Sequence, residues 1–306
     1  MIAVETNLLS KSFDQSITAL DGLSIAIPEG AVFALLGPNG SGKTTTIRLL
    51  NGILSPSSGE ARIFGLKPGD NISQVHAMCG VMTETAQAYE GMNAEENLEF
   101  IGRIYGLSSA EIQEKTRRWL SFFELEDARS RPVKTFSTGM KKRLQLAMAI
   151  LHRPRLLFLD EPTSGLDPEA ARNVNLLVKR LSEEEKTTVF LCTHQLRYAE
   201  DICTLYGFMS LGKLIGFGTA RELSAQKEHA ITLNLRTSGI PPQWACQRDD
   251  NGWMKIPIKD DAEAGQKIRE LVSTGIEIFE ARQEHMNLED LYFAFQEGHR
   301  KENHHQ

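Results

Sequence analysis

The sequence has few cysteines and no long apolar run, and both absences narrow the class of protein. The four cysteines lie far apart and form no C-x-x-C pair: Cys79, Cys192, Cys203 and Cys246. This spacing fits neither a disulfide framework nor a zinc site, so we expect reduced thiols. No apolar run approaches the ~18 residues of a membrane helix. The first six residues carry neither a basic leader nor a secretory apolar core. We therefore expect a cytoplasmic chain, for which any membrane role has to come through a partner.

Positive charge is not in excess either. The formal net charge is −6 and the isoelectric point about 5.8, so the electrostatic footprint of a nucleic-acid binder is missing and no nucleic-acid partner is expected. The chain has 306 residues, of which 41% are hydrophobic and 24% charged. These values are typical of a globular protein with one large or two ordinary domains.

One glycine-rich segment is the most informative part of the chain. It fits the phosphate-binding pattern G-x-x-x-x-G-K-[ST], follows an apolar run over 31–36 and leads into a helical stretch over 45–50. In such a loop the backbone N–H groups form an anion site at a helix N-terminus. Lys43 would reach the β- and γ-phosphates, and the Thr44 hydroxyl would bind Mg²⁺. The alternative is a glycine-rich turn with a surface lysine. The expected nucleotide-binding residues of this segment are Gly37, Pro38, Asn39, Gly40, Ser41, Gly42, Lys43, Thr44 and Thr45.

The rest of the first 219 residues predicts an α/β core that holds a helical insertion. Residues 1–36 and 59–65 have strand patterns, and the region from Asn93 to Leu151 is helical, with capping-box signals at Asn93 and Ser108. Continuous apolar runs over 156–159 and 188–192 are typical of parallel strands buried on both faces. We place the insertion at about 86–152 and the end of this domain at 219.

Residues 220–306 predict a separate small α+β domain. Apolar residues alternate over 231–235 and over 254–258, followed by a helix over 262–273 and a strand over 276–279. A last helix over 287–296 has one apolar face, which consists of Leu288, Leu291, Tyr292 and Phe295. That face packs on its own sheet, or it docks against the first domain or a twin subunit; both readings stay open. We expect a regulatory or dimer-stabilising role for this domain.

Two carboxylates follow a buried strand. Asp160 and Glu161 come directly after the apolar run 156–159, at the strand end where open α/β sheets bind ligands. Asp160 would hold Mg²⁺, and Glu161 would polarise an attacking water. Taken alone, the pair is equally typical of a strand that ends at the surface. Ser137 and Gly139 precede a helix and would form another anion site, although an ordinary N-cap explains them as well.

Taken together, these motifs resemble the ATP-binding cassette family over roughly residues 5–218. The segment 37–44 is similar to its Walker A motif, 156–161 to Walker B, 137–140 to the signature and 164–167 to the D-loop. His194 stands where the family has its switch histidine, and Phe13 where an aromatic ring stacks on adenine. Without this context, His194 is equally a polar residue at a strand end and Phe13 a core aromatic.

The resemblance implies an ATPase that works as a dimer with ATP and Mg²⁺. Each ATP would lie between one Walker A motif and the partner's signature, so Ser137 and Gly139 would act across the dimer. The implied catalytic residues are Glu161, His194 and Lys43, and the implied metal ligands are Thr44, Asp160 and Glu84. A separate transmembrane permease is implied, docking at about 87–105. Tyr89, Met92 and Phe100 of that segment are equally consistent with insertion core. The chain would be peripheral on the inner face of the cell membrane.

Three positions depart from the family pattern. Thr138 replaces the glycine at the second signature position, Met140 replaces the signature glutamine, and Glu84 stands where the Q-loop glutamine is usual. These variants look like those of bacterial exporter ATPases for drugs, lipids, polysaccharides or ions. The alternatives are a degenerate regulatory cassette or a non-transport cassette protein. The intact catalytic residues argue against the first, and the single cassette with its acidic charge argues against the second.

Overall fold

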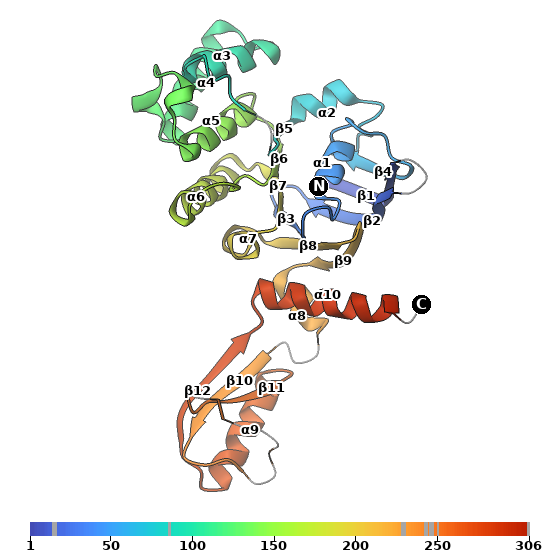
Figure 1. The fold of residues 1–306 in the computed structure, drawn as a ribbon, viewed down its shortest axis with the longest axis vertical. Helices are drawn as coiled ribbons and strands as arrows, with labels where there is room; N and C mark the ends of the chain where they lie inside the picture. The colour runs from blue at the N-terminus through green and yellow to red at the C-terminus, as the bar shows by residue number, and fades with distance from the viewer. Residues whose placement is uncertain are drawn as a thin grey trace. The chain divides into compact units, whose positions relative to one another are not determined.

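The computed structural model describes residues 1–13, 17–84, 87–227, 231–241, 244, 248–249 and 251–304, the side chains of 300–304 excepted. The chain forms two compact units, Met1–Phe217 and Gly218–Gln306 (Figure 1). Among the expectations above, Cys246 and residue 86, the expected start of the insertion, lie outside the described residues.

A six-stranded sheet is the centre of the N-terminal unit. Its strands lie in the order β5-β6-β7-β3-β8-β9, and the first five pair in parallel. Every residue of β3, β6 and β7 is buried, which explains their continuous apolar sequences and confirms the expected parallel strands. The strands are β5 (Cys79–Met82), β6 (Leu156–Asp160), β7 (Thr188–Thr193), β3 (Val32–Leu36), β8 (Leu205–Ser210) and β9 (Lys213–Gly218).

A second, antiparallel sheet contains the first strands of the chain. Its order is β2-β1-β4, formed by β2 (Ile17–Pro28), β1 (Ile2–Phe13) and β4 (Ser58–Ile63). This confirms the expected N-terminal antiparallel strands. Helix α1 (Lys43–Leu50) buries Ile47 and Leu50 in the apolar cluster that joins both sheets. The short helix α2 (Ile72–Met78) leads into β5.

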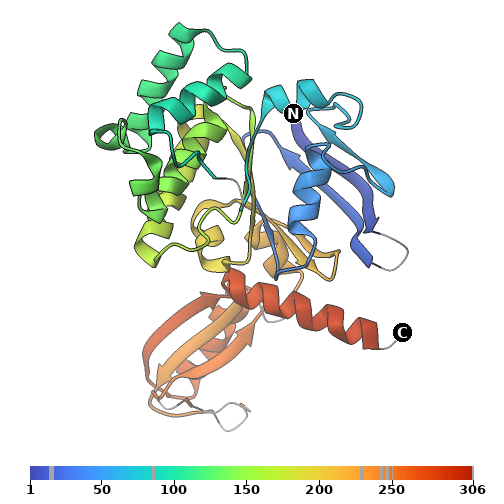
Figure 2. The same cartoon turned by 45° about the horizontal axis from the view of Figure 1, so that its top comes forward.

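The helical insertion consists of α3 (Ala94–Ile104), α4 (Ser109–Phe122) and α5 (Thr138–Ile150), with 3₁₀ turns over Glu126–Ala128 and Val133–Thr135. Figure 2 shows these helices grouped on one side of the unit. Both expected capping boxes are present, Asn93 with Glu96 and Ser108 with Glu111. Each satisfies two backbone N–H groups that a helix start leaves open. Helices α6 (Pro168–Glu185) and α7 (Leu196–Ile202) follow β6 and β7.

The C-terminal unit has a three-stranded antiparallel sheet in the order β11-β10-β12. Leu233, Met254 and Ile256 of this sheet pack with Ala264 and Leu271 of α9, so alternation correctly predicted the buried sheet face. The elements are α8 (Ala220–Ala225), β10 (Ile231–Thr237), β11 (Met254–Ile258), α9 (Asp261–Ser273), β12 (Ile278–His285) and α10 (Leu288–His304).

Two expected boundaries in this unit are wrong. The strand expected over 276–279 is β12, which begins at Ile278 and continues to His285. It is an edge strand that, in the described part of the chain, pairs with β10 alone, and its second half is exposed, so polar residues there gave no strand signal. Helix α10 likewise runs past 296 to His304, because its exposed polar positions need no apolar period.

The apolar face of α10 is buried. Leu288, Leu291, Tyr292 and Phe295 are each at most 7% exposed. Helix α10 packs against α8, and the Lys227 ammonium lies 3.8 Å from the centroid of the Phe295 ring. Part of this face is therefore covered by the α8 segment, a contact that the sequence had not suggested. No helix of the described chain combines the length and apolar character needed to cross a bilayer.

The three described cysteines are free and buried, and this yields a prediction about their reactivity. Burial raises the pKa of Cys79 to about 12 and raises the pKa of Cys192 and of Cys203 above the ordinary range. Only the thiolate reacts rapidly with aromatic disulfides. In a Cys246→Ser chain at about pH 8, where an ordinary thiol reacts, no thiol should react within minutes until denaturant is added. A rapidly labelled thiol in the native Cys246→Ser chain would contradict this.

Candidate active site

The register of three parallel strands brings distant motifs to one sheet edge. Leu36 of β3 pairs with Thr193 of β7, and Asp160 of β6 pairs with Cys192 of the same strand. The glycine-rich loop, the two carboxylates and His194 therefore leave the sheet at the same level. This is the edge at which open α/β sheets bind their ligands.

At two positions of the loop before α1, a residue larger than glycine would clash with the backbone. Gly42 has φ +102°, and a Cβ there would lie 2.5 Å from the Ala19 carbonyl oxygen. A Cβ at Gly37 would lie 2.6 Å from the Met209 carbonyl oxygen. Lys43 begins α1 and is only 6% exposed. Its Nζ donates to the carbonyls of Gly37 at 2.7 Å and of Pro38 at 3.1 Å, so the ammonium folds back over the loop.

A hydroxyl and a carboxylate meet beside this loop. Thr44 Oγ1 donates to Asp160 Oδ2 at 2.8 Å, and Asp160 is 3% exposed. Burial raises the pKa of Asp160, the Thr44 hydrogen bond opposes that shift, and the charge of Glu161 adds to it. The pair therefore presents oxygen atoms in a place where a positive charge would be stabilised.

Three neighbouring side chains surround the carboxylate of Glu161. Its side chain is buried, Oε2 accepts from Thr193 Oγ1 at 2.9 Å, and Oε1 lies 2.9 Å from His194 Nδ1. Oε1 also lies 3.7 Å from Lys43 Nζ. The backbone of Glu161 has φ +52°, in the left-handed region that costs a non-glycine residue energy and that recurs at functional sites. Both carboxylate oxygens are thus fixed in direction.

Three supporting residues were not found from the sequence. Thr193 holds Glu161, and its Oγ1 also accepts from the Gln195 backbone N–H at 3.0 Å. The Gln195 side chain in turn accepts from Thr163 Oγ1 at 2.8 Å. What the sequence offers for finding them is position: Thr193 stands directly before His194, and Gln195 directly after it. Polar residues at a strand end have no periodicity that would reveal such bonds.

Four expected site residues are not joined to this cluster by any hydrogen bond or ion pair within the described parts of the chain. Ser137 is the N-cap of α5 and accepts from the Met140 N–H at 3.2 Å. Gly139 lies in the first turn of the same helix. Phe13 ends β1, is 38% exposed and has the Lys11 ammonium 5.4 Å from its ring centroid. Glu84 is exposed, just beyond β5.

The residues of the cluster fit a nucleotide phosphate with Mg²⁺. Ser41 is 2% exposed, and its hydroxyl has no hydrogen-bond partner among the described residues, so a phosphate oxygen would satisfy it. The described residues contain no group of three or more histidine, cysteine or carboxylate side chains arranged to hold a metal ion. Mg²⁺ in phosphate sites is commonly held by one or two protein oxygens together with the phosphates. Thr44 and Asp160 match that pattern.

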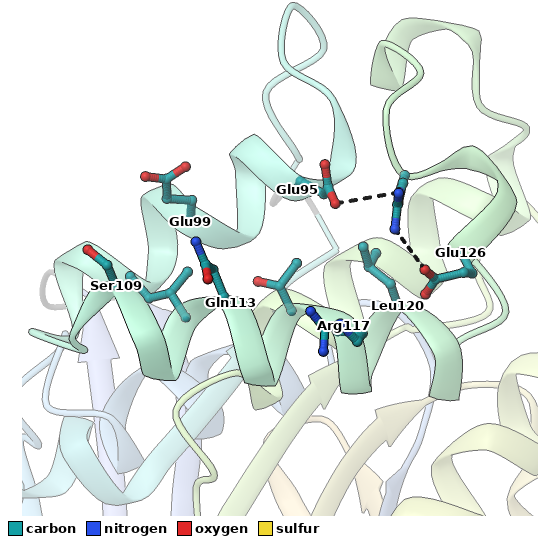
Figure 3. Close-up of a pocket in the computed structure, with 10 residues that line it drawn as sticks. Glu95, Glu99, Ser109, Gln113, Arg117, Leu120 and Glu126 are labelled. Atoms are coloured by element: carbon teal, nitrogen blue, oxygen red, sulfur yellow. Dashed lines mark hydrogen bonds and ion pairs between the residues drawn. The ribbon is translucent and has the colours of Figure 1, made fainter.

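A separate pocket of about 360 Å³ lies between α3 and α4 (Figure 3). Glu95 and Glu126 lie on its wall, with oxygens 3.7 Å and 3.1 Å from nitrogens of Arg129. Arg103 likewise pairs with Glu99. The three glutamates that line the pocket are therefore paired with arginines of the helical insertion, and none of its lining residues belongs to the glycine-rich loop or the carboxylate cluster.

Comparison with known proteins finds a matching family model and similar chains. The family model described as "ABC transporter" matches residues 20–164. The daunorubicin/doxorubicin resistance ATP-binding protein DrrA of Streptomyces peucetius is 36% identical over 261 residues, which cover 85% of this chain and 78% of that protein. The linearmycin resistance ATP-binding protein LnrL of Bacillus subtilis is 32% identical over 73% of this chain and 71% of its own.

Solved structures show the same cassette fold. The cbiO1 protein of Clostridium perfringens, part of the ABC transporter complex cbiONQ, superposes with a TM-score of 0.68 at 27% identity, over 74% of this chain and 91% of that one. An ATP-binding subunit of an ABC transporter gives 0.65 at 31% identity, over 73% and 92%. The expected cassette core with antiparallel strands and a helical insertion is confirmed.

The close approach at Gly37 predicts the result of adding one methyl group. Gly37→Ala should lower the Tm by about 2–12 °C, because overpacking of this kind costs about 1–3 kcal/mol, and should also weaken nucleotide binding. Gly69→Ala is the matched control, since a Cβ there meets nothing within 4 Å. Scanning calorimetry and nucleotide titration of both chains check this. Equal behaviour of the two variants would contradict the tight loop.

Proposed function

The chain belongs to the ABC transporter family as an ATP-binding subunit, and we propose on that basis that its ATPase activity drives a separate membrane permease in export. The drug-resistance names of DrrA and LnrL support the export direction. The catalytic part of this proposal rests on the Glu161 carboxylate, which is held in place beside Lys43 and His194. Through the permease the chain would lie on the inner face of the membrane.

Glu161 is proposed as the general base. Thr193 and His194 hold its two oxygens in one direction, so that the carboxylate takes a proton from water as the water attacks the γ-phosphorus. Lys43 would exchange the carbonyls of Gly37 and Pro38 for phosphate oxygens, and its positive charge would offset the charge of the transferring group. Mg²⁺, held by Thr44 and Asp160, would supply further neutralisation of the phosphate oxygens. Glu84 is a proposed third oxygen ligand.

A composite dimer would complete the site. Ser137 and Gly139 lie at the start of α5, whose thirteen residues direct a positive dipole end outward. Because no hydrogen bond or ion pair within one described chain joins them to the loop around Lys43, we assign them to the ATP of a second copy. Phe13, partly exposed at the end of β1, is proposed to stack on the adenine.

The segment after Glu84 is proposed to receive the permease. Tyr89 is 51% exposed, whereas Met92 and Phe100 are half-buried, so Tyr89 is the residue of the three available to a partner. Asn97, fully buried, holds Tyr89 in place by accepting from its N–H at 2.7 Å and donating to its carbonyl at 3.1 Å. For the domain over 220–306 we propose a regulatory or dimer-stabilising role.

The first test of this proposal is the removal of the base. Glu161→Gln should lower kcat by about 100-fold or more, because general-base catalysis typically contributes 10²–10⁴. Affinity for ATP should stay within about threefold of the wild type, and the variant should accumulate as a closed dimer at saturating ATP. Glu99→Gln, an exposed glutamate on α3 that pairs with Arg103, is the matched control. Near wild-type turnover in Glu161→Gln would show that Glu161 is not the general base.

The second test concerns the composite site. Chains with Ser137→Arg and chains with Lys43→Ala should each be inactive alone. In their mixture, a heterodimer combines the intact loop of one chain with the intact α5 start of the other, so phosphate release should exceed that of both parents. A mixture no more active than its parents, or an active monomer of either variant, would contradict action across the dimer.

A further inference from the structure

A second pocket of the N-terminal unit lies at the amino ends of the parallel strands. Arg155 comes directly before β6 and Thr187 directly before β7, and these two strands pair in parallel. Both residues therefore lie at the sheet edge opposite to the one that holds Asp160 and Glu161. They line a pocket of about 230 Å³. Pockets for drug-sized ligands measure about 300–1,000 Å³, so this one suits a smaller molecule or an ion.

The charges around this pocket favour an anion. Among the described residues that line it, four are basic and two are acidic. Both acidic side chains are already paired, since Arg118 donates to Glu185 and Arg155 Nη2 lies 2.6 Å from Glu29 Oε1. Two positive charges are therefore in excess, and no carboxylate is left for a cation to bind.

The two remaining cations are available to a ligand. Arg153 and Lys186 are exposed, and neither side chain forms a hydrogen bond or an ion pair with another described residue. The backbone joins their two segments, because the Thr188 N–H donates to the Arg155 carbonyl at 2.9 Å. The positive charges thus stand on two loops that the sheet holds together.

A buried hydrogen-bond donor lines the same pocket. Trp119 of α4 is 0% exposed, and its indole N–H has no hydrogen-bond partner in the described part of the chain. Such a donor is costly to bury without an acceptor. The Arg118 guanidinium lies 4.9 Å from the centroid of the Trp119 ring, and its ion pair with Glu185 links Trp119 to the segment of Lys186. Indole and guanidinium groups donate but do not accept, so the pocket needs an acceptor.

The two cations also stand where they would stabilise helices. Lys186 is the C-cap of α6, and Arg153 follows the end of α5 at Ile150. A positive charge there offsets the partial negative charge of a helix C-terminus. This structural role accounts for the cations but provides no acceptor for the Trp119 N–H, whereas a bound anion accounts for both.

We propose that this pocket binds a small oxyanion of charge −2, such as inorganic phosphate, through Arg153, Lys186 and the indole N–H of Trp119. Hydrogen bonds from charged donors to phosphate oxygens are among the strong ones. The site lies at the sheet edge opposite to the nucleotide site, so its anion is distinct from the phosphates of ATP. The proposal does not depend on the proposed ATPase activity.

The test is calorimetric titration of full-length chains with inorganic phosphate, in a buffer free of phosphate and sulfate. All chains carry Lys43→Ala, so that the glycine-rich loop adds no second phosphate site. This parent should bind phosphate saturably at one site. Arg153→Gln with Lys186→Gln should weaken binding about tenfold or more. Trp119→Phe keeps an aromatic ring and should weaken it about tenfold, because a hydrogen bond to a charged group is lost. Lys179→Gln, an exposed position of α6 outside the pocket, should bind like the parent.

Absence of saturable phosphate binding by the parent would overturn the proposal. An affinity left unchanged by the paired charge substitution, or by Trp119→Phe, would overturn it as well. If Trp119→Phe does not fold, the paired substitution at the two exposed positions decides. A lower Tm of that variant with unchanged phosphate affinity would assign Arg153 and Lys186 to the helix ends alone. Since Lys43 is replaced in every chain, none of these results bears on the nucleotide site.

Discussion

The parallel register of β3, β6 and β7 is the constraint on which the site depends. Because Leu36 lies opposite Thr193 and Asp160 opposite Cys192, the three chain exits meet at one edge without any further adjustment. A shift of one residue in either pairing would turn Asp160 or Thr193 to the other face of the sheet. The fully buried strands prevent such a shift, since each would then lose its packing on both sides. The apolar core thereby fixes the positions of the polar side chains of the site.

The second requirement is to keep charged groups in a poorly solvated place. Buried carboxylates are costly unless each oxygen has a partner. Here Asp160 accepts from Thr44, and Glu161 has Thr193, His194 and Lys43 around it. These contacts hold the groups ready before a nucleotide arrives, so little reorganisation is left for the reaction. The left-handed backbone of Glu161 is part of the same arrangement, in which local strain is maintained by the surrounding structure.

The sequence correctly predicted those elements whose formation depends on residues close together in the chain. The capping boxes at Asn93 and Ser108 and the buried parallel strands depend on residues a few positions apart, and they are present as expected. It failed for the length of β12 and of α10, whose exposed ends carry no apolar pattern. It also missed the support of Glu161 by Thr193 and the packing of α10 against α8. Both depend on which strands and helices become neighbours, and that information is absent from any single segment.

The central claim is that this sheet edge hydrolyses ATP through the loop around Lys43. The most direct measurement is phosphate release from ATP by the purified full-length chain, compared with a Lys43→Ala chain at the same concentration. The account predicts that the wild-type chain releases phosphate in the presence of Mg²⁺ and stops when the metal is chelated, while Lys43→Ala stays at background. Equal phosphate release by both chains, or none by the wild type at saturating ATP and Mg²⁺, would contradict it.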